Sequence, residues 1–503
     1  MNTISLSFLA DSLKLIKPEI ALAITLVALV LVDLIMHKDK RFIPYVFIAG
    51  LIVVFFLIID QYSAHSFAFM SRPNIGMMVI DPFGNFFKLL IVFSTIIVIL
   101  FSVLSNEIKD GIDRQGEYYV LIAGMILGMF IIISSADLIL IYVGLELLSL
   151  PSYVLAGFNK NTIRNSEASL KYVIFGGVSS GIMLFGISIF YGLTGSTNLY
   201  EINSLMQAAQ AHGLTFILAT IMIFVGMGFK ISAAPFHFWT PDVYEGSPIP
   251  ITAYLSIASK AAGFALLIRF IKVTFIQSVD PDGFWHLINA VDWKTLLIII
   301  SILTMTLGNF TALWQNNMKR LLAYSSIAHA GYLLLGLTVL SNEGTVAIIV
   351  YFIVYGLMNL GAFLVVMLIA NKIGSEEIDD YNGLGSKAPF LSVSLAIFLV
   401  SLTGLPPTAG FIGKLYIFLA LVDAKMIAVA VIALLNTVVS LYYYVRVLKH
   451  VFLNEPVKNV PEFSTSIVSI VFVTIMVVPV LILGVYFTPI VNLAKSSIAL
   501  MGF

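Results

Sequence analysis

Five ionisable side chains interrupt strongly apolar segments of this sequence. They are Glu146, Lys230, Lys260, His329 and Lys414. Glu146 stands in the middle of LILIYVGLELLSLPSYVLAGF, and Lys260 stands in ITAYLSIASKAAGFALLIRF. Placing an ionised side chain at the centre of a bilayer costs between about 2.5 and more than 10 kcal/mol. Side chains at such positions are therefore candidates for a function rather than for packing alone.

Three deep lysines cannot all form ion pairs with one comparably deep glutamate. A lysine without a counter-charge in an apolar environment gives up its proton readily. Lysines poised between the charged and the neutral form are what a proton relay requires, so we predict that the chain conducts protons. Three alternatives stay open: the buried charges are structural salt bridges between helices, His329 is a satisfied core histidine, and Lys171 forms a local helix-face pair with Glu167.

The composition places these residues in a membrane. The chain has 503 residues, of which 60% are hydrophobic and 11% are charged, and its mean hydropathy is +1.02. Soluble domains carry about 25% charged residues. Basic and acidic residues are equal at 27 each, so the net charge gives no argument for a nucleic-acid partner. The absence of cysteine excludes disulfides, thiol nucleophiles and cysteine-ligated iron–sulfur clusters.

Apolar stretches of about 20 residues predict an all-α, polytopic membrane protein of about fourteen transmembrane helices. The spans are expected near residues 18–36, 43–60, 82–105, 118–135, 137–157, 169–193, 214–238, 250–273, 294–314, 320–341, 345–371, 389–423, 427–450 and 466–490. The stretch 389–423 is too long for one straight crossing, and Pro406-Pro407 in its middle predicts a helix that is broken inside the membrane. The N-terminal segment lacks the pattern of a removable signal peptide.

The spacing of the deep residues suggests an internal repeat of five helices. Lys230 and Lys414 lie beside proline-containing breaks 184 residues apart, and Glu146 and His329 lie 183 residues apart. A unit with an odd number of crossings requires a copy of opposite orientation, so we predict two inverted repeats, helices 4–8 and 9–13, with helices 7 and 12 broken. The single membrane domain 1–503 then comprises helices 1–3 (1–117), a first repeat (118–273), a second repeat (294–450) and helix 14 (466–490).

Basic residues concentrate in one set of alternate loops. One set holds Lys38, Lys40, Arg41, Lys109, Arg114, Lys160, Arg164, Lys171, Lys319, Arg320, Lys372, Lys387, Arg446, Lys449 and Lys458, and the other holds Lys14, Lys17, Arg72, Lys272, Lys294, Lys425 and Lys495. Cytoplasmic loops carry the excess of Lys and Arg. Both termini are therefore predicted on the non-cytoplasmic side, which requires an even number of crossings.

Four segments resemble a known family. GLELLSLPSYVLAGF, KISAAPFHFWTPDVYEGSPIPITAYLSIASKAAG, MKRLLAYSSIAHAGY and LTGLPPTAGFIGKLY are similar to the antiporter-like membrane subunits of proton-pumping NADH:quinone oxidoreductase, respiratory complex I. FHFWTPDVYEGSP resembles most the N-subunit branch of that family. The resemblance extends from about Pro18 to the last span. The M-subunit branch has a glutamate where this chain has Lys414, and the L-subunit branch continues into a long lateral helix.

The resemblance implies a role for each deep residue. Glu146 on helix five would pair with Lys230 on broken helix seven and tune its proton affinity. Lys260 would be the central relay lysine on helix eight. Lys414 would be the terminal group on broken helix twelve, from which the proton is handed on.

Further residues and the partners also follow from the resemblance. His329 and waters would bridge the central and terminal lysines, and Lys171 would lie near the first pair. No cofactor is expected in this chain; NADH, FMN, iron–sulfur clusters and quinone are implied in partner subunits. The partners are other membrane subunits of complex I, including a neighbouring antiporter-like subunit, within the lipid bilayer of the bacterial cell inner membrane.

Other functions fit parts of the pattern. A subunit of a multi-subunit sodium/proton antiporter shares the fold and the lysine relay, and the segment FHFWTPDVYEGSP argues for complex I instead. The sequence of this chain does not distinguish an NADH-linked complex from a ferredoxin- or hydrogenase-linked relative, because the electron donor binds to other subunits. A structural membrane scaffold would carry buried charges only as salt bridges.

Overall fold

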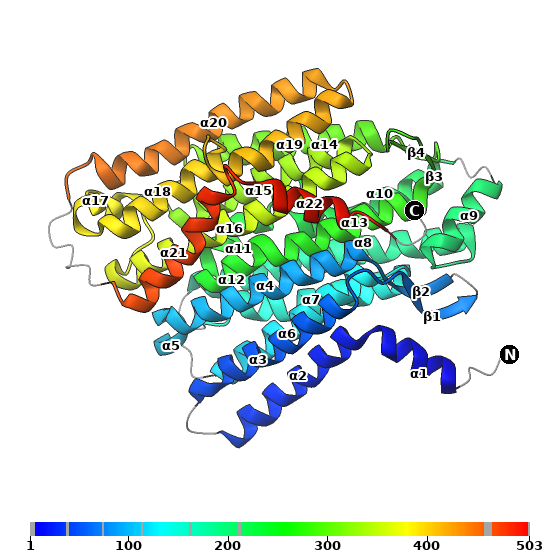
Figure 1. The fold of residues 1–503 in the computed structure, drawn as a ribbon, viewed down its shortest axis with the longest axis horizontal. Coiled ribbons are helices and arrows are strands. Elements are labelled where there is room, and N and C mark those ends of the chain that lie inside the picture. The colour runs from blue at the N-terminus through cyan, green and yellow to red at the C-terminus, as the bar shows by residue number, and fades with distance from the viewer. Residues whose placement is uncertain are drawn as a thin grey trace.

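The computed structural model describes residues 6–36, 40–72, 75–111, 114–159, 163–209, 213–456 and 465–500. Lys38, Lys160 and Lys458, which contributed to the predicted orientation, lie outside these ranges. Figure 1 shows long helices lying side by side, with α2 on one side of the bundle and α20 on the opposite side. The all-α expectation is confirmed for the bulk of the chain.

Twelve helical segments within the described residues are long and apolar enough to cross a membrane. They are α2 (Lys17–Ile35), Lys40–Asp60 with α3 (Ile43–Asp60), α4 (Pro82–Leu104), α6 (Gln115–Ser134), α7 (Leu138–Ala156), α8 (Ile163–Thr194), α10 (Leu214–Ile231), Ile249–Phe275, α14 (Trp293–Ala312), α15 (Met318–Thr338), α16 (Asn342–Ile373) and α20 (Ile427–Phe452). Two shorter apolar helices, α18 (Pro389–Thr403) and α21 (Ile467–Ile482), occupy two further predicted spans. The chain is a multi-pass membrane protein, and the count of fourteen crossings stays a prediction.

Shorter helices connect or cover the ends of the long ones. They are α1 (Leu6–Leu15), α5 (Asn106–Gly111), α9 (Leu199–Ala209), α11 (Trp239–Gly246), α17 (Leu384–Lys387) and α22 (Thr488–Ser496), together with 3₁₀ turns at Lys40–Phe42 and Ile378–Tyr381. α19 (Ala409–Asp423) is instead the second half of the broken 389–423 segment and packs against α16. Both described ends of the chain lie at one end of the bundle (Figure 1), where the Ala499 carbonyl accepts a hydrogen bond of 3.4 Å from Phe83 N at the start of α4.

Two aspartates cap the helices that follow them. Asp81 accepts a hydrogen bond from Gly84 N at 2.8 Å, and Asp137 accepts from Ile139 N at 2.9 Å. Such side chains satisfy amide groups that have no partner within the first helical turn. They therefore fix where α4 and α7 begin.

Two β-hairpins were not expected from the sequence. Strands β1 (Ser66–Arg72) and β2 (Ile75–Ile80) pair antiparallel, and so do β3 (Ile276–Val279) and β4 (Trp285–Leu287). Each lies in a connection that is too short and too polar to register as a span, so an argument from apolar length could not detect it. The hairpins cover helix ends at the side of the bundle that holds both termini (Figure 1).

Both predicted helix breaks are present. α10 ends at Ile231, Ser232 adopts a left-handed φ of 61°, and α11 starts only at Trp239. α18 ends at Thr403, and Gly404 with a φ of 88° turns the chain toward α19. The breaks therefore lie where the deep lysines Lys230 and Lys414 lie, whereas the inversion of the two repeats stays a prediction.

A third irregularity was missed. The run Ile249–Phe275 consists of α12 (Ile249–Tyr254), a π-helical turn η2 (Leu255–Ser259) and α13 (Lys260–Phe275). π-Turns inside α-helices occur frequently at functional sites. This one ends directly before Lys260.

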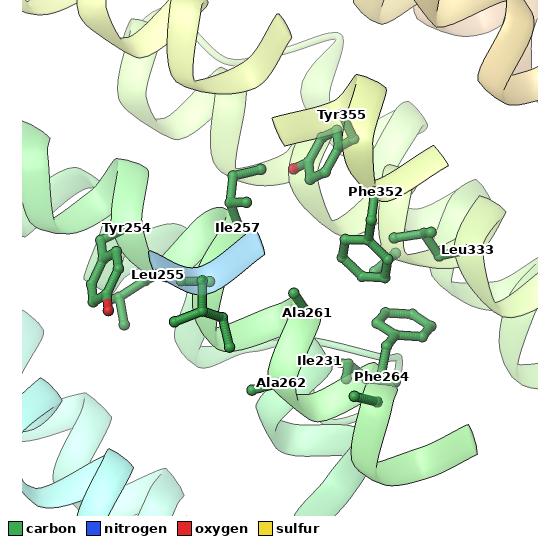
Figure 2. Packing of buried hydrophobic residues seen from close by; sticks show 14 of the residues in the cluster. Ile231, Tyr254, Leu255, Ile257, Ala261, Ala262, Phe264, Leu333, Phe352 and Tyr355 are labelled. Carbon is green, nitrogen blue, oxygen red and sulfur yellow. The ribbon is translucent and has the colours of Figure 1, made fainter. Parts of the chain in front are cut away.

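The run Ile249–Phe275 is buried along its whole length and forms the centre of the bundle with α15 and α16. In Figure 2, Phe264 of α13 and Phe352 of α16 lie close to Leu333 of α15. The Phe264 and Phe352 rings are 5.4 Å apart and meet edge to face. By contrast, only about a third or less of the residues in the apolar segments of α2, α3, α8 and α20 are buried within the described chain. The deep lysine of α13 is thus shielded from lipid by protein on all sides.

Candidate functional site

Lys230 occupies the last turn of α10 and is fully buried. Its Nζ donates a hydrogen bond of 3.0 Å to Ser149 Oγ on α7 and lies 5.8 Å from the centre of the Tyr172 ring. Glu146 lies one turn before Ser149 on the same helix and is half-buried. The two residues of the predicted pair are therefore neighbours, but the ammonium is bonded to the serine hydroxyl and not to the carboxylate.

Lys260 follows the π-turn and reaches α15. Its Nζ donates to Ser326 Oγ at 2.6 Å and to the Ser326 carbonyl at 2.8 Å. The Tyr355 hydroxyl of α16 donates to the same Ser326 Oγ at 2.9 Å. A continuous set of hydroxyl groups thus leads from the lysine into the space between α15 and α16.

His329 lies one turn after Ser326 on α15 and is buried among tyrosines. Its Nδ1 is 2.6 Å from the Tyr351 hydroxyl, and its Nε2 is 3.5 Å from the Tyr444 hydroxyl. The ring centre is 4.9 Å from that of Tyr355. Both ring nitrogens thus face hydroxyl groups, which can donate or accept a proton.

Lys414 lies just after the second break. Its Nζ donates to the Thr403 carbonyl at 2.8 Å and to Thr437 Oγ1 at 3.3 Å, and it stands 4.4 Å from the centre of the Tyr332 ring. Thr403 is the last residue of α18, where unpaired carbonyl groups make the helix end electronegative. The Tyr332 hydroxyl is 2.9 Å from Thr437 Oγ1. The ammonium is thus stabilised by dipoles and an aromatic face.

One helix connects these groups. Ser326, His329 and Tyr332 are three residues apart on α15, so they lie along one side of that helix. The first contacts Lys260 and the last contacts Lys414. The structure therefore brings together the central lysine, the histidine and the terminal lysine of the predicted row along a single helix face.

Lys171 lies in a different environment. Its Nζ is 2.7 Å from Glu167, as the sequence spacing suggested, and 2.6 Å from Asp242 of α11. Arg320 of α15 contacts Asp242 at 2.7 Å and Glu245 at 2.8 Å. Burial alone would raise the pKa of the Asp242 carboxyl, but hydrogen bonds from Lys171 and Arg320 outweigh it and hold that pKa below its usual range. Lys171 is part of a charge cluster that joins α8, α11 and α15.

A polar cavity of about 550 Å³ opens beside this cluster. Its lining includes Glu107, Glu376 and Ile249, the first residue of the run that leads to Lys260. Burial raises the pKa of the Glu107 carboxyl, and the nearby Lys319 opposes that shift. The cavity can hold water and contains a carboxyl group that binds a proton more tightly than usual.

Two other buried cations are bound to carboxylates, and sequence reasoning missed them. Lys88 of α4 contacts Glu19 of α2 at 2.5 Å, and Arg269 of α13 holds Asp81 with two contacts of 2.7 and 2.8 Å. Lys88 and Arg269 also interrupt apolar segments, so the criterion that selected the deep lysines could have found them. The salt-bridge alternative therefore applies to these two pairs.

A further basic residue is deeper than its sequence position suggested. Lys272 in the last turn of α13 is buried, although we had counted it among loop residues. Its Nζ donates to Asn342 Oδ1 at 3.2 Å and lies 4.9 Å from the centre of the Trp285 ring of β4. In the described part of the chain, no three His, Asp or Glu side chains are placed to share a metal ion.

Comparison with known proteins identifies the class. A model of the family described as NADH:quinone oxidoreductase/Mrp antiporter, transmembrane, matches residues 135–440. A chain of the solved respiratory complex I of Thermus thermophilus with bound Aureothin superimposes with a TM-score of 0.78 at 32% identity, over 95% of this chain and 99% of that one. A chain of the Mrp complex of a Dietzia species shares the fold, with a TM-score of 0.80 at 20% identity over 98% and 97% of the two chains. The chain belongs to this family of antiporter-like membrane subunits.

One relative shows which branch of the family this chain resembles most. NADH-quinone oxidoreductase subunit N 2 of Chloroherpeton thalassium is 47% identical over 490 residues, which are 96% of this chain and 94% of the relative. The similarity to the N-subunit branch that FHFWTPDVYEGSP indicated is thereby confirmed.

Proposed function

We propose that this chain is the proton-translocating N-type membrane subunit of an NADH:quinone oxidoreductase, and that protons move through Glu146, Lys230, Lys260, His329 and Lys414. One observation carries the relay. The three deep lysines donate only to hydroxyl and carbonyl groups, whereas Lys88 and Arg269 are bound to carboxylates.

The difference in partners matters because a carboxylate holds the proton on its partner. Breaking a buried ion pair by removing one charge is strongly destabilising, at about 3–5 kcal/mol. Deprotonation of a lysine that is bonded to neutral dipoles costs less free energy, because no unpaired anion stays behind. The deep lysines, and Lys272 by the same criterion, are therefore buried cations that can change charge during a cycle.

The order of groups supports a path along the bundle centre. Protons would enter from the cavity that Glu107 lines, or beside Lys171, whose cluster joins α8 to α11. Lys230 would receive its proton under the influence of Glu146. Transfer from Lys260 would pass through the Ser326 and Tyr355 hydroxyls to His329, and waters would complete the path to Lys414.

The redox chemistry belongs to other subunits in this proposal. NADH, FMN, iron–sulfur clusters and quinone would be bound there, and electron transfer would shift the charge near Glu146. A displacement of that carboxylate from Lys230 would weaken the lysine's hold on its proton. The complex would lie in the bacterial inner membrane with a second antiporter-like subunit beside this one and both termini of the chain on the non-cytoplasmic side.

The test uses the purified complex in proteoliposomes. Lys230→Ala or Glu146→Ala should reduce the rate of proton uptake at least about tenfold, which corresponds to an activation free energy higher by about 1.4 kcal/mol. The complex should stay assembled. Lys495→Ala, an exposed lysine of α22, is the matched control. Normal pumping by both relay variants would show that the assignment is wrong.

A multi-subunit sodium/proton antiporter is the second candidate function. The likeness to the Mrp complex chain is a likeness of fold at 20% identity, well below that to the NADH-quinone oxidoreductase relatives. Affinity purification of the tagged chain from native membranes separates the two. NADH-oxidising subunits should accompany the chain, and their replacement by antiporter subunits alone would favour the second candidate.

A further inference from the structure

The first two lysines of the proposed relay have no direct link. Lys230 donates to Ser149 of α7, and Lys260 donates to Ser326 of α15. Within the described residues, no hydrogen bond joins one of these pairs to the other. A proton that leaves Lys230 therefore needs further groups to reach Lys260.

Tyr172 of α8 and Tyr244 of α11 carry buried hydroxyl groups without a hydrogen bond. Both side chains are fully buried, and neither hydroxyl has a hydrogen-bond partner in the part of the chain that the structure describes. The large majority of buried hydroxyls in proteins are bonded to protein groups or to ordered water. Because no protein group is in position here, these two hydroxyls are suited to bind buried water.

Tyr172 lies beside the first lysine. The centre of its ring is 5.8 Å from Lys230 Nζ. Its hydroxyl faces Ser152 of α7, which lies one turn after Ser149, the serine that accepts the hydrogen bond of the lysine. The geometry of Tyr172 and Ser152 falls short of a direct hydrogen bond. A single water can therefore connect the two hydroxyls.

Tyr244 lies beside the partner of the second lysine. Its hydroxyl faces Ser326, which accepts from Lys260, again without forming a direct hydrogen bond. The same hydroxyl interacts electrostatically with the hydroxyls of Tyr172 and Tyr355. Tyr244 is thus within electrostatic range of a hydroxyl from the surroundings of each lysine.

Trp239 fixes the positions of both tyrosine rings. Its ring stacks on that of Tyr172, with centres 4.4 Å apart and planes inclined by 5°. The Tyr244 ring meets the indole edge to face, with centres 6.1 Å apart. Trp239 Nε1 donates to the Phe229 carbonyl at 3.0 Å, directly before Lys230 in the chain. The indole therefore ties both tyrosines to the turn of α10 that carries the lysine.

We propose that the hydroxyl groups of Tyr172 and Tyr244, together with bound water, carry protons from Lys230 to Lys260, a role that rests on the proposed function of the chain. The Lys230 ammonium gives a proton to the first oxygen of this path. Each hydroxyl or water that accepts a proton passes another one on, because a hydroxyl both donates and accepts. The last oxygen gives its proton to the neutral Lys260 amine, so both tyrosines stay neutral and only the two lysines change charge.

The test is proton uptake by the purified complex in proteoliposomes. Tyr244→Phe and Tyr172→Phe each keep the ring and lose the hydroxyl, and should slow uptake about threefold to tenfold, as the loss of one hydrogen bond does. The slowing should be larger in D₂O than in H₂O, because proton transfer then limits the rate. A packing defect would leave the isotope effect at the wild-type value. Normal uptake by both variants, or slowing with the wild-type isotope effect, would overturn the proposal.

Tyr381→Phe is the matched control. Tyr381 is also fully buried with a hydroxyl that lacks a partner among the described residues, but it belongs to the turn Ile378–Tyr381, which none of the deep lysines contacts. This variant should take up protons at the wild-type rate, and slowing equal to that of Tyr244→Phe would contradict a specific path.

Lys230→Ala in the same assay separates this role from the proposed function. Normal uptake by Lys230→Ala would contradict the proposed function and, with it, the role of the tyrosines. Loss of uptake in Lys230→Ala together with normal uptake in both tyrosine variants would contradict only the role of the tyrosines.

Discussion

At the residue scale, tyrosine hydroxyls extend the predicted row of lysines. Tyr355 donates to Ser326, which accepts from Lys260, while its ring lies against His329. The chemistry of the row therefore depends on neutral side chains that no argument from charge could select. A tyrosine in an apolar helix carries no charge, and the expected place of tyrosine in a membrane protein is the interface with water.

We expect Tyr355→Phe to slow proton pumping about threefold to tenfold. The capacity of the complex to oxidise NADH should stay unchanged. The ring keeps its contact with His329, but the hydroxyl donor to Ser326 is lost, and a hydrogen bond contributes about 0.5–1.5 kcal/mol. The rate of proton uptake by proteoliposomes measures the effect. Tyr254→Phe is the control, because that hydroxyl pairs with Thr95 away from the row. Equal slowing by both variants would mean that the effect is one of packing.

At the element scale, α14 and α15 pack unusually closely. A Cβ atom on Gly331 would lie 2.5 Å from Met305 N, and one on Gly308 would lie 2.6 Å from Ala328 N. Glycine therefore allows the two backbones to meet, as small residues do between membrane helices. This contact fixes the rotation of α15, and with it the positions of Ser326, His329 and Tyr332.

Gly331→Val should destabilise the complex by about 1–3 kcal/mol or more, because overpacking forces α14 and α15 apart. It should also reduce pumping more than assembly, since α15 carries Ser326 and His329. Thermal unfolding and proton uptake measure the two effects. Gly192→Ala in α8, where a Cβ atom meets nothing within 4 Å, should leave both unchanged. A stable, fully active Gly331→Val complex would contradict the close packing.

The charge cluster between α8, α11 and α15 predicts a dependence on pH. The pKa of Asp242 is lower in the folded chain than in the unfolded one, where it is about 3.9. Its contribution to stability is therefore complete above that value and is lost as the pH falls through the folded-state pKa. Because the pair is partly exposed, the contribution is at most about 1 kcal/mol.

Asp242→Asn should remove this component of the acid transition. Melting temperatures of the purified complex between pH 6 and pH 3 should fall less steeply for the variant than for the wild type. Asp11→Asn, which changes an exposed pair with Lys14, should keep the wild-type slope. Parallel curves for wild type and Asp242→Asn would contradict the assignment.

Sequence patterns predicted the elements better than their contacts. Prolines and glycines revealed the two breaks, because few residues permit a turn within an apolar helix. The π-turn before Lys260 has no such signature, since LSIAS is an ordinary apolar helical sequence. The hydrogen-bond partners of the lysines could not be predicted from the sequence either. Ser326, Thr403 and Thr437 belong to other segments, which approach the lysines only in the folded bundle.

At the scale of the whole molecule, the two described chain ends lie at the same end of the bundle. α5 and α17, which carry Lys109 and Lys387, lie at the other end (Figure 1), and the excess of basic residues predicts that this end faces the cytoplasm. The orientation in the membrane can be tested directly.

Cysteine labelling would establish the orientation, because the chain contains no cysteine of its own. In right-side-out vesicles an impermeant maleimide should modify Lys495→Cys but not Lys387→Cys. Inside-out vesicles should give the reverse. The labelled subunit is identified by its mass, so cysteines in partner subunits do not interfere. The opposite pattern would place both termini in the cytoplasm.

The π-turn Leu255–Ser259 sets the direction in which the Lys260 side chain points. Each residue of an α-helix advances the direction of its side chain by about 100°. A π-turn contains one extra residue, so the side chains that follow it are rotated by the same angle relative to the side chains that precede it. Tyr254 can thus face Thr95 of α4 while Lys260 faces Ser326 of α15. If Leu255–Ser259 formed a regular α-helix instead of a π-turn, the Lys260 ammonium group would rotate away from α15 while the helix axis stayed in place.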